Sequence, residues 1–206
     1  IYFIYGLRPE RRERQRVEAE TALRLAPGLP QAYLAMGLVH LWGSPQDKAA
    51  GLEEIELALR GLPNDAEVWA SLGYASAAAG RWDRWEQAQR RATELNPRDA
   101  NLFLDLRGNT LWKLRRYEEA TVAYGRALAL APDMQDARLA RAYVFIQWQG
   151  RLDSLRAALE SDSVHYTLFG SALYWRVRLA LLERKPDRTL ALLPRPGEVV
   201  FEMQDF

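Results

Sequence analysis

The chain has 206 residues, no cysteine, a formal net charge of +1 and a 49% share of hydrophobic residues. The near-neutral charge offers no electrostatic basis for binding nucleic acid, so we expect no nucleic-acid partner. A chain without cysteine has no disulfides, no thiol chemistry and no cysteine-ligated metal. The apolar stretch at residues 1–5 is too short to cross a bilayer, so we expect no membrane insertion and a cytoplasmic location.

Apolar residues recur with helical periodicity along most of the chain, and short turns separate the periodic segments. Near the N-terminus, arginines and glutamates alternate in a pattern typical of a solvated, ion-paired helix face. In chain order, we predict helices over residues 11–25, 31–42, 46–60, 66–79, 82–95, 100–114, 117–131, 135–149, 152–160, 165–184 and 186–193.

Several helix ends carry their own start and stop signals. Asp65, Asp99 and Asp133 stand where a side chain would cap the first turn of a helix. Gly80 and Gly150 stand where a helix would end in a left-handed residue. These signals predict the boundaries of the helices in the middle of the chain.

Prolines close successive helix pairs at a nearly constant interval. Pro27, Pro63, Pro97 and Pro132 are separated by 36, 34 and 35 residues. Self-similarity at this period, with two helices per unit, is typical of stacked helical repeats, in which each unit contacts only its neighbours. We therefore predict an all-α, right-handed superhelical solenoid of antiparallel helix pairs.

Two motifs give the repeat a family resemblance. Trp69, Leu72 and Gly73 stand in the first helix of one pair, and Ala120, Tyr124, Ala127 and Pro132 stand in the second helix of the next. Residues of these types at these spacings resemble the tetratricopeptide repeat (TPR). Glycines recur in the first helices as Gly37, Gly73 and Gly108, and alanines recur in the second helices as Ala22, Ala58, Ala92 and Ala127. We interpret them as the Gly and Ala positions that let paired helices approach closely.

The resemblance weakens at identifiable residues. Trp85 and Gln89 stand where the motif has a small residue and an aromatic one, and Tyr143 replaces a first-helix glycine. The motif register also degrades beyond Gly150. We divide residues 1–206 as a single array into a partial leading repeat, four repeats, an eroded repeat and a tail: 1–29, 30–64, 65–98, 99–132, 133–163, 164–194 and 195–206.

The N-terminal residues bear on whether the array is complete. We interpret residues 1–5 as the severed end of a preceding repeat's first helix, and an ordinary N-terminal tail is the alternative. In the first interpretation the chain is a piece of a longer protein.

The sequence offers little that indicates catalysis. No glycine-rich phosphate loop is present. His40 and His165 lie on different repeats, and neither has a ligand-type partner at the spacing of a helical metal site. The serines lack both a strand–turn–helix setting and a base. We therefore expect a chain that is not an enzyme and needs no metal or cofactor.

The resemblance implies a concave groove lined mainly by first helices, which takes an extended peptide or a partner's helix. Carried over position by position, the groove residues are Leu38, Trp42, Tyr74, Asp105, Asn109, Trp112, Lys113, Gln147 and Trp148, with Leu34, Leu41, Ala140 and Val144 beside them. Trp42, Trp112 and Trp148 recur near one repeat position, and tryptophan is a common interface hot spot. The alternative is that each tryptophan packs on its neighbour. Asp105 stands where TPR domains that bind a C-terminal carboxylate need lysine, which argues against that specificity.

We therefore expect a protein–protein interaction scaffold that binds a peptide or helix of a partner, or its own effector domain. The repeats resemble the TPR regions of bacterial multidomain signalling and regulatory proteins. One alternative is a regulatory or substrate-docking arm of a larger bacterial enzyme, such as a cyclase, kinase or transferase, whose catalytic domain this chain does not include. Another is a structural scaffold that self-associates through apolar ends, at residues 1–5 and around Trp175.

Overall fold

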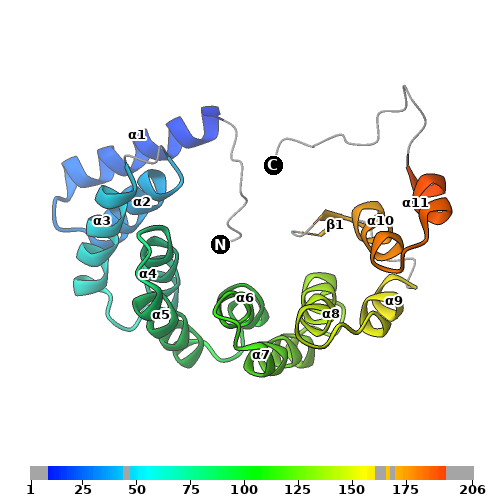
Figure 1. Ribbon diagram of the computed structural model, residues 1–206. Helices are drawn as coiled ribbons and strands as arrows, with labels where there is room; N and C mark the ends of the chain where they lie inside the picture. The colour runs from blue at the N-terminus through cyan, green and yellow to red at the C-terminus, as the bar shows by residue number, and fades with distance from the viewer. Residues whose placement is uncertain (1–8, 44–46, 161–165, 168–169, 194–206) are drawn as a thin grey trace. The chain divides into compact units, whose positions relative to one another are not determined.

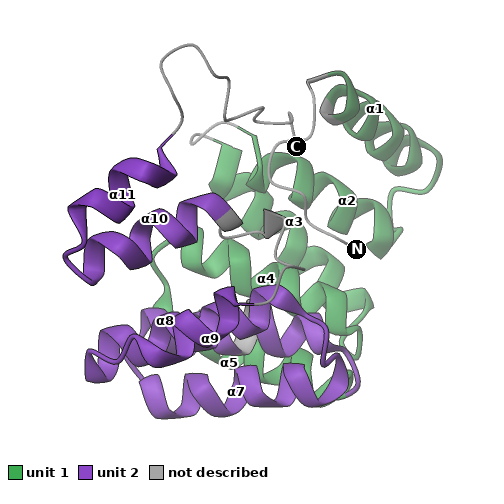
Figure 2. Ribbon diagram, turned by 90° about the vertical axis from the view of Figure 1, so that its right-hand side faces the viewer, with its two compact units in different colours: residues 1–97, 201–206 green, residues 98–200 purple. Residues whose placement is uncertain are grey.

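The computed structural model describes residues 9–43, 47–160, 166–167 and 170–193; residues 9, 12, 105–107, 166–167 and 170–172 are described by their backbone alone. The chain divides into two compact units (Figure 2), one of residues 1–97 with 201–206 and one of residues 98–200. The helices and strands of each unit carry the labels of Figure 1.

The first unit consists of helices packed in sequence order. α2 packs against α3, α4 packs against α5, and α3 joins the two pairs by packing against α4. The bounds are α1 (Pro9–Leu25), α2 (Pro30–Leu41), α3 (Lys48–Gly61), α4 (Ala66–Ala78) and α5 (Trp82–Leu95). Each helix begins and ends within a few residues of its predicted limits.

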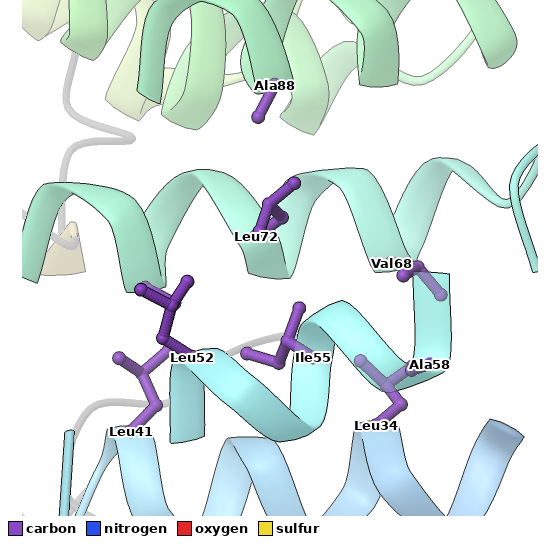
Figure 3. Close-up of a cluster of buried hydrophobic side chains, with 9 residues drawn as sticks. Leu34, Leu41, Leu52, Ile55, Ala58, Val68, Leu72 and Ala88 are labelled. Atoms are coloured by element: carbon purple, nitrogen blue, oxygen red, sulfur yellow. The ribbon is translucent and has the colours of Figure 1, made fainter. Parts of the chain in front are cut away.

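One apolar core runs through the first unit (Figure 3). Leu52 and Ile55 of α3 lie between the leucines of α2 and Leu72 of α4. Ile55 is fully buried and Leu72 is 1% exposed, so the second helix α3 fills the seam to the following pair. This is the nearest-neighbour packing that a repeat array requires.

The second unit repeats the pairing and then departs from it. α7 packs against η2 and α8, and α8 packs against α9. The bounds are the π-helix η2 (Leu102–Gly108), α6 (Asn109–Lys113), α7 (Tyr117–Leu130), α8 (Gln135–Gln149), α9 (Asp153–Leu159), β1 (Tyr166–Thr167), β2 (Gly170–Ser171), α10 (Ala172–Leu182) and α11 (Pro186–Leu192). Helix pairs thus dominate both units, which confirms the prediction of an all-α solenoid.

Two local expectations were wrong. The predicted helix over residues 100–114 contains the π-helical segment η2, whose wider turns the apolar pattern does not reveal. The predicted helix over residues 165–184 begins only at Ala172, because β1 and β2 pair antiparallel, with Tyr166 opposite Ser171 and Thr167 opposite Gly170. Aromatic and β-branched residues favour a strand there, and Gly170 disfavours a helix. His165 lies outside the described residues.

Two of the three predicted aspartate caps are present. Asp65 Oδ1 accepts hydrogen bonds from the backbone N–H groups of Glu67 and Val68, at 2.8 and 3.3 Å. Asp99 Oδ1 accepts one from the backbone N–H of Asn101 at 2.9 Å. The prediction for Asp133 was wrong, because the N-cap residue of α8 is Met134 and no side chain caps this helix.

A second device fixes the turns between repeats. The carbonyl oxygen of a closing proline accepts a hydrogen bond from the side chain six residues later in three turns. Tyr33 donates to Pro27 at 2.9 Å, Trp69 donates to Pro63 at 2.8 Å, and Arg138 donates to Pro132 at 2.8 Å. The motif tryptophan therefore ties the first helix of its repeat to the preceding turn.

We expect Tyr33→Phe to lower the free energy of unfolding by about 0.5–1.5 kcal/mol, the net value of one hydrogen bond. Tyr117→Phe is the matched control, because the Tyr117 hydroxyl has no hydrogen-bond partner among the described residues. Urea denaturation of both variants measures the difference, and equal losses would contradict a role for the proline carbonyl.

The recurring first-helix glycines make room for large side chains, not for small ones as we expected. A Cβ added to Gly108 would collide with the ring of Tyr124, and one added to Gly73 would collide with Nε2 of Gln89. Tyr124 and Gln89 are each 1% exposed. The glycine and the large second-helix residue therefore form one packing unit, in which Gln89 takes the place of the aromatic residue.

Gly108→Ala should reduce stability by about 1–3 kcal/mol, because the rigid, buried Tyr124 ring has to move to admit a methyl group. The same substitution at Gly125, in α7, should stabilise the protein by about 0.5–1 kcal/mol, because nothing lies within 4 Å of the added Cβ and alanine favours a helix. Thermal unfolding of the two variants checks the opposite signs. A Gly108→Ala protein as stable as the wild type would disprove the close contact.

Glu183, just after α10, joins the last helices of the second unit. Its carboxylate lies 2.6 Å from Arg156 of α9, 2.8 Å from Lys185 and 3.6 Å from Arg188 of α11, and its side chain is 4% exposed. Hydrogen bonds from Lys185 and Arg156 lower the pKa of Glu183 to about 2. The fold therefore favours the charged carboxylate.

The stability that Glu183 contributes should be complete above its ordinary pKa of 4.5 and be lost as the pH falls through about 2. We expect the Tm difference between the wild type and Glu183→Gln to be largest above pH 4.5 and to shrink toward pH 2. Differential scanning calorimetry across this range tests the expectation. A Tm difference that stays constant over the whole window would exclude this carboxylate as the source.

Candidate functional site

First helices of successive pairs meet through residues one repeat apart in the second unit. Trp112 of α6 donates a hydrogen bond from its indole Nε1 to Oε1 of Gln147 in α8 at 2.5 Å. Arg178 of α10 donates one from Nη2 to the Tyr143 hydroxyl of α8 at 2.5 Å. Both pairs are 35 residues apart, so the repeat period itself brings α6, α8 and α10 together at this surface.

A cavity of about 210 Å³ opens where these helices meet. Its walls are largely aromatic, and most of its lining comes from first helices: Asn109, Trp112, Tyr124, Ala140, Tyr143, Tyr174, Trp175 and Arg178. The rings touch edge to face, with centroids 5.8 Å apart for Trp112 and Tyr143 and 5.5 Å apart for Tyr143 and Trp175. Edge-to-face contacts of this kind favour one relative orientation of the rings.

Arg178 is the cation of this aromatic cavity. Its guanidinium carbon lies 4.9 Å from the ring centroid of Tyr143 and 5.8 Å from that of Tyr174. Besides its bond to Tyr143, it donates from Nη1 to the Tyr174 hydroxyl at 2.6 Å. Two aromatic faces and two phenol oxygens hold the side chain, and no carboxylate in the described part of the chain forms an ion pair with it.

The back of the aromatic cavity depends on the packing of Tyr124. The ring of Tyr124 fills the space beside Gly108, and its hydroxyl donates to Oδ1 of Asn109 at 2.7 Å. The Asn109 carbonyl oxygen thus already has a partner, and its amide N–H groups are the part of this side chain that can still serve a ligand.

A second cavity, of about 350 Å³, shares Trp112 in its lining with the aromatic cavity. It is more polar, and its lining is Trp112, Lys113, Arg115, Tyr117 and Gln147. Arg115 has a φ of +60°, whereas Gly80 and Gly150 supply glycine at the equivalent helix ends. An arginine in the left-handed region carries strain that glycine avoids.

The structure gathers four of the predicted groove residues around these two cavities. Asn109, Trp112, Lys113 and Gln147 line one or both of them. Trp148 lines neither; it is 41% exposed and stacks on Phe145 with centroids 6.4 Å apart. Asp105 belongs to η2, and its side chain lies outside the described part.

The other predicted residues lie in the first unit. Leu38 is half-buried and packs on the core of that unit, beside Trp42 and Tyr74. The rings of Trp42 and Tyr74 are 6.0 Å apart and tilted by 59°. They form an aromatic pair like that of Trp112 and Tyr143, but within their own unit.

Three further groove positions were wrong. Leu34, Leu41 and Val144 are 9%, 3% and 1% exposed and belong to the hydrophobic cores of their units. The family position alone places a residue on a first helix, but these apolar side chains face neighbouring helices. Ala140, also 7% exposed, does line the aromatic cavity.

Sequence reasoning missed Tyr143, Tyr174 and Arg178. The sequence marked Tyr143 only as a residue that replaces a first-helix glycine, and Arg178 belongs to no recognised motif. Their signal is the 35-residue interval between Tyr143 and Arg178, which equals that between Trp112 and Gln147. Trp175, expected at an exposed apolar end, is 4% exposed and offers little surface for self-association.

The described residues offer no sign of two other kinds of function, metal binding and membrane insertion. In those ranges no group of three or more His, Cys, Asp or Glu side chains is placed to hold a metal ion. No described helix combines the length and hydrophobicity needed to cross a membrane. His40 takes part in a hydrogen bond between Nδ1 and Oε2 of Glu54 at 2.7 Å, and burial raises the pKa of Glu54. This pair joins α2 to α3.

Comparisons with known proteins agree with this architecture. The sequence model of the tetratricopeptide repeat matches residues 102–134, and no curated protein sequence matches the chain. The solved structure of PilF from Pseudomonas aeruginosa is 18% identical, with a TM-score of 0.69 over 89% of this chain and 82% of PilF. YrrB is 21% identical (TM-score 0.62, 85% and 84% covered), and a thermophilic TPR protein of Thermus thermophilus is 24% identical (TM-score 0.63, 85% and 92% covered). At these identities the likeness establishes the fold.

Proposed function

We propose that this chain, a tetratricopeptide-repeat protein by its fold and by its motif at residues 102–134, is an interaction module that binds a segment of a partner protein. The binding surface is the one formed by the first helices α6, α8 and α10. The observation that carries the proposal is the aromatic cavity that these helices line.

The composition of the cavity linings favours binding over catalysis. Trp, Tyr and Arg, which make up most of the aromatic cavity, are the residue types most enriched at interface hot spots. Neither lining, as far as the described residues go, contains a carboxylate, an imidazole or a thiol. The surface therefore offers contact area and hydrogen-bond donors, and it lacks the usual acid–base pairs of an active site.

The side chains of the site are also held in place before a partner arrives. Gln147 fixes the indole of Trp112, and Arg178 fixes the phenols of Tyr143 and Tyr174. Preordered side chains lose little conformational entropy on association, so more of the contact energy remains as affinity. A segment that fills the cavity would bury aromatic surface at small ordering cost.

The fold supplies a precedent for a peptide ligand. The solved structure of YrrB is that of a TPR protein with an unusual peptide-binding site. Repeat arrays of helix pairs present extended surfaces to which a strand-like or helical segment can bind. The segment belongs to a separate protein or to an effector domain joined to this array, and the chemistry of the surface is the same in both cases.

A peptide-display selection on the wild-type chain tests the proposal. Peptides enriched by the wild type should bind Trp112→Ala at least about tenfold more weakly, because the substitution removes a wall common to both cavities. Trp82→Ala is the matched control, since Trp82 is a 53% exposed tryptophan on α5 of the first unit. Circular dichroism confirms that both variants fold. Equal affinity of the selected peptides for Trp112→Ala and wild type would refute this site.

A further inference from the structure

We infer that the partner segment is acidic, with one Asp or Glu carboxylate bound at Arg178 in the aromatic cavity and a second at Arg115 in the adjoining polar cavity. This inference rests on the proposed function and specifies the chemistry of its ligand. It depends on the balance of charges and hydrogen-bond groups around the two cavities.

The charged side chains among the described lining residues of the two cavities are all cations. Arg178 lines the aromatic cavity, and Lys113 and Arg115 line the polar one. No Asp or Glu lines either cavity within the described residues, and Arg115 and Arg178 have no ion-pair partner there. Elsewhere the arginines of this chain readily find carboxylates, as Arg16, Arg116 and Arg156 do. The lining is therefore complementary to an anion.

The hydrogen-bonding groups around the aromatic cavity likewise include donors that lack acceptors. Nε of Arg178 and Nε1 of Trp175 are buried donors that have no acceptor among the described residues, and Trp175 is only 4% exposed. The side-chain carbonyl oxygen of Asn109 accepts a hydrogen bond from the Tyr124 hydroxyl, so Asn109 can offer a ligand its amide N–H donors. Buried donors without acceptors are costly, so an occupant that supplies acceptor oxygens is favoured over an apolar one.

The site selects an acidic side chain next to an apolar or aromatic residue. Arg178 offers a planar guanidinium, which binds a carboxylate through charge-assisted hydrogen bonds. The surrounding rings of Trp112, Tyr143 and Tyr174 provide flat apolar walls. Because the two cavities share Trp112 in their linings, they lie next to each other, and a short segment can place carboxylates on both cations.

Arg115 can be replaced by glycine without straining the backbone. Its backbone lies in the left-handed region, with φ +60°, where glycine is free of strain. Arg115→Gly thus removes one of the two cations that line the polar cavity, and the glycine relieves the backbone strain of the turn. We therefore expect this variant to stay folded, so that a loss of binding reports on the missing guanidinium.

The test uses two blocked peptides as probes, acetyl-Glu-Glu-Phe-Glu-Glu-amide and its glutamine isostere acetyl-Gln-Gln-Phe-Gln-Gln-amide. The blocked termini leave side-chain carboxylates as the anionic groups. Tryptophan fluorescence and isothermal titration calorimetry measure their binding to the full chain and to Arg178→Met, Arg178→Lys and Arg115→Gly. Arg176→Met is the matched control, because Arg176 is an exposed arginine on α10 that lines neither cavity.

We expect the glutamate peptide to bind at least about tenfold more tightly than the glutamine peptide, and more weakly as salt is raised. Arg178→Met should abolish this preference, Arg178→Lys should restore part of it, and Arg115→Gly should reduce it. Arg176→Met should leave it unchanged.

Equal binding of the two peptides, lost in Trp112→Ala, would overturn the acidic specificity while supporting the proposed binding site. Absence of binding by the glutamate peptide would also overturn the acidic specificity. It would not by itself overturn the proposed function, because the display selection samples every side-chain chemistry. An unchanged glutamate preference in both Arg178→Met and Arg115→Gly would place the anion elsewhere and overturn the inference.

Discussion

The contact between a first-helix glycine and a large second-helix side chain organises this protein. Gly108 admits the ring of Tyr124, which is 1% exposed. The same ring carries the hydroxyl that orients Asn109 and forms the back of the aromatic cavity. Packing inside a helix pair thereby determines the shape of the surface on which a partner is proposed to bind. Gly73 and Gln89 repeat the arrangement with an amide in place of the ring, so the first unit has the same packing without the same hydroxyl.

An aromatic contact between neighbouring first helices recurs in both units. Trp42 touches Tyr74 in the first unit, and Trp112, Tyr143 and Trp175 touch in series in the second. The rings alone could be read as ordinary packing between repeats. Arg178 distinguishes the second unit, because it adds a cation to this series at a place where no described carboxylate neutralises it. The two units therefore share the aromatic contacts between first helices, and the second unit differs by the cation that Arg178 adds to them.

The sequence predicts those features that each repeat copies. The spacing of Pro27, Pro63, Pro97 and Pro132, the caps at Asp65 and Asp99, and the stops at Gly80 and Gly150 were sufficient to predict the helix pairs. The π-helix η2 and the β1–β2 hairpin escaped prediction because they occur where the apolar period gives no warning. The candidate site was only half predictable. Trp112, Asn109 and Gln147 follow from family positions, whereas the cavity also needs Tyr143 and Arg178, which belong to no motif and meet only through tertiary packing.

The bond from a side chain to the closing proline's carbonyl has a consequence for how such arrays change in evolution. The bond joins residues six apart, so the same short stretch of sequence encodes both of its partners. The proline closes one repeat and the donor begins the next, so duplication or loss of a repeat that carries both groups still leaves a closing proline six residues before a donor, and the turn stays fixed. Contacts 35 residues apart, such as that of Tyr143 with Arg178, are instead remade with whatever neighbour the rearrangement provides. The scaffold of the array is thus inherited repeat by repeat, while its recognition surface is created anew at each junction.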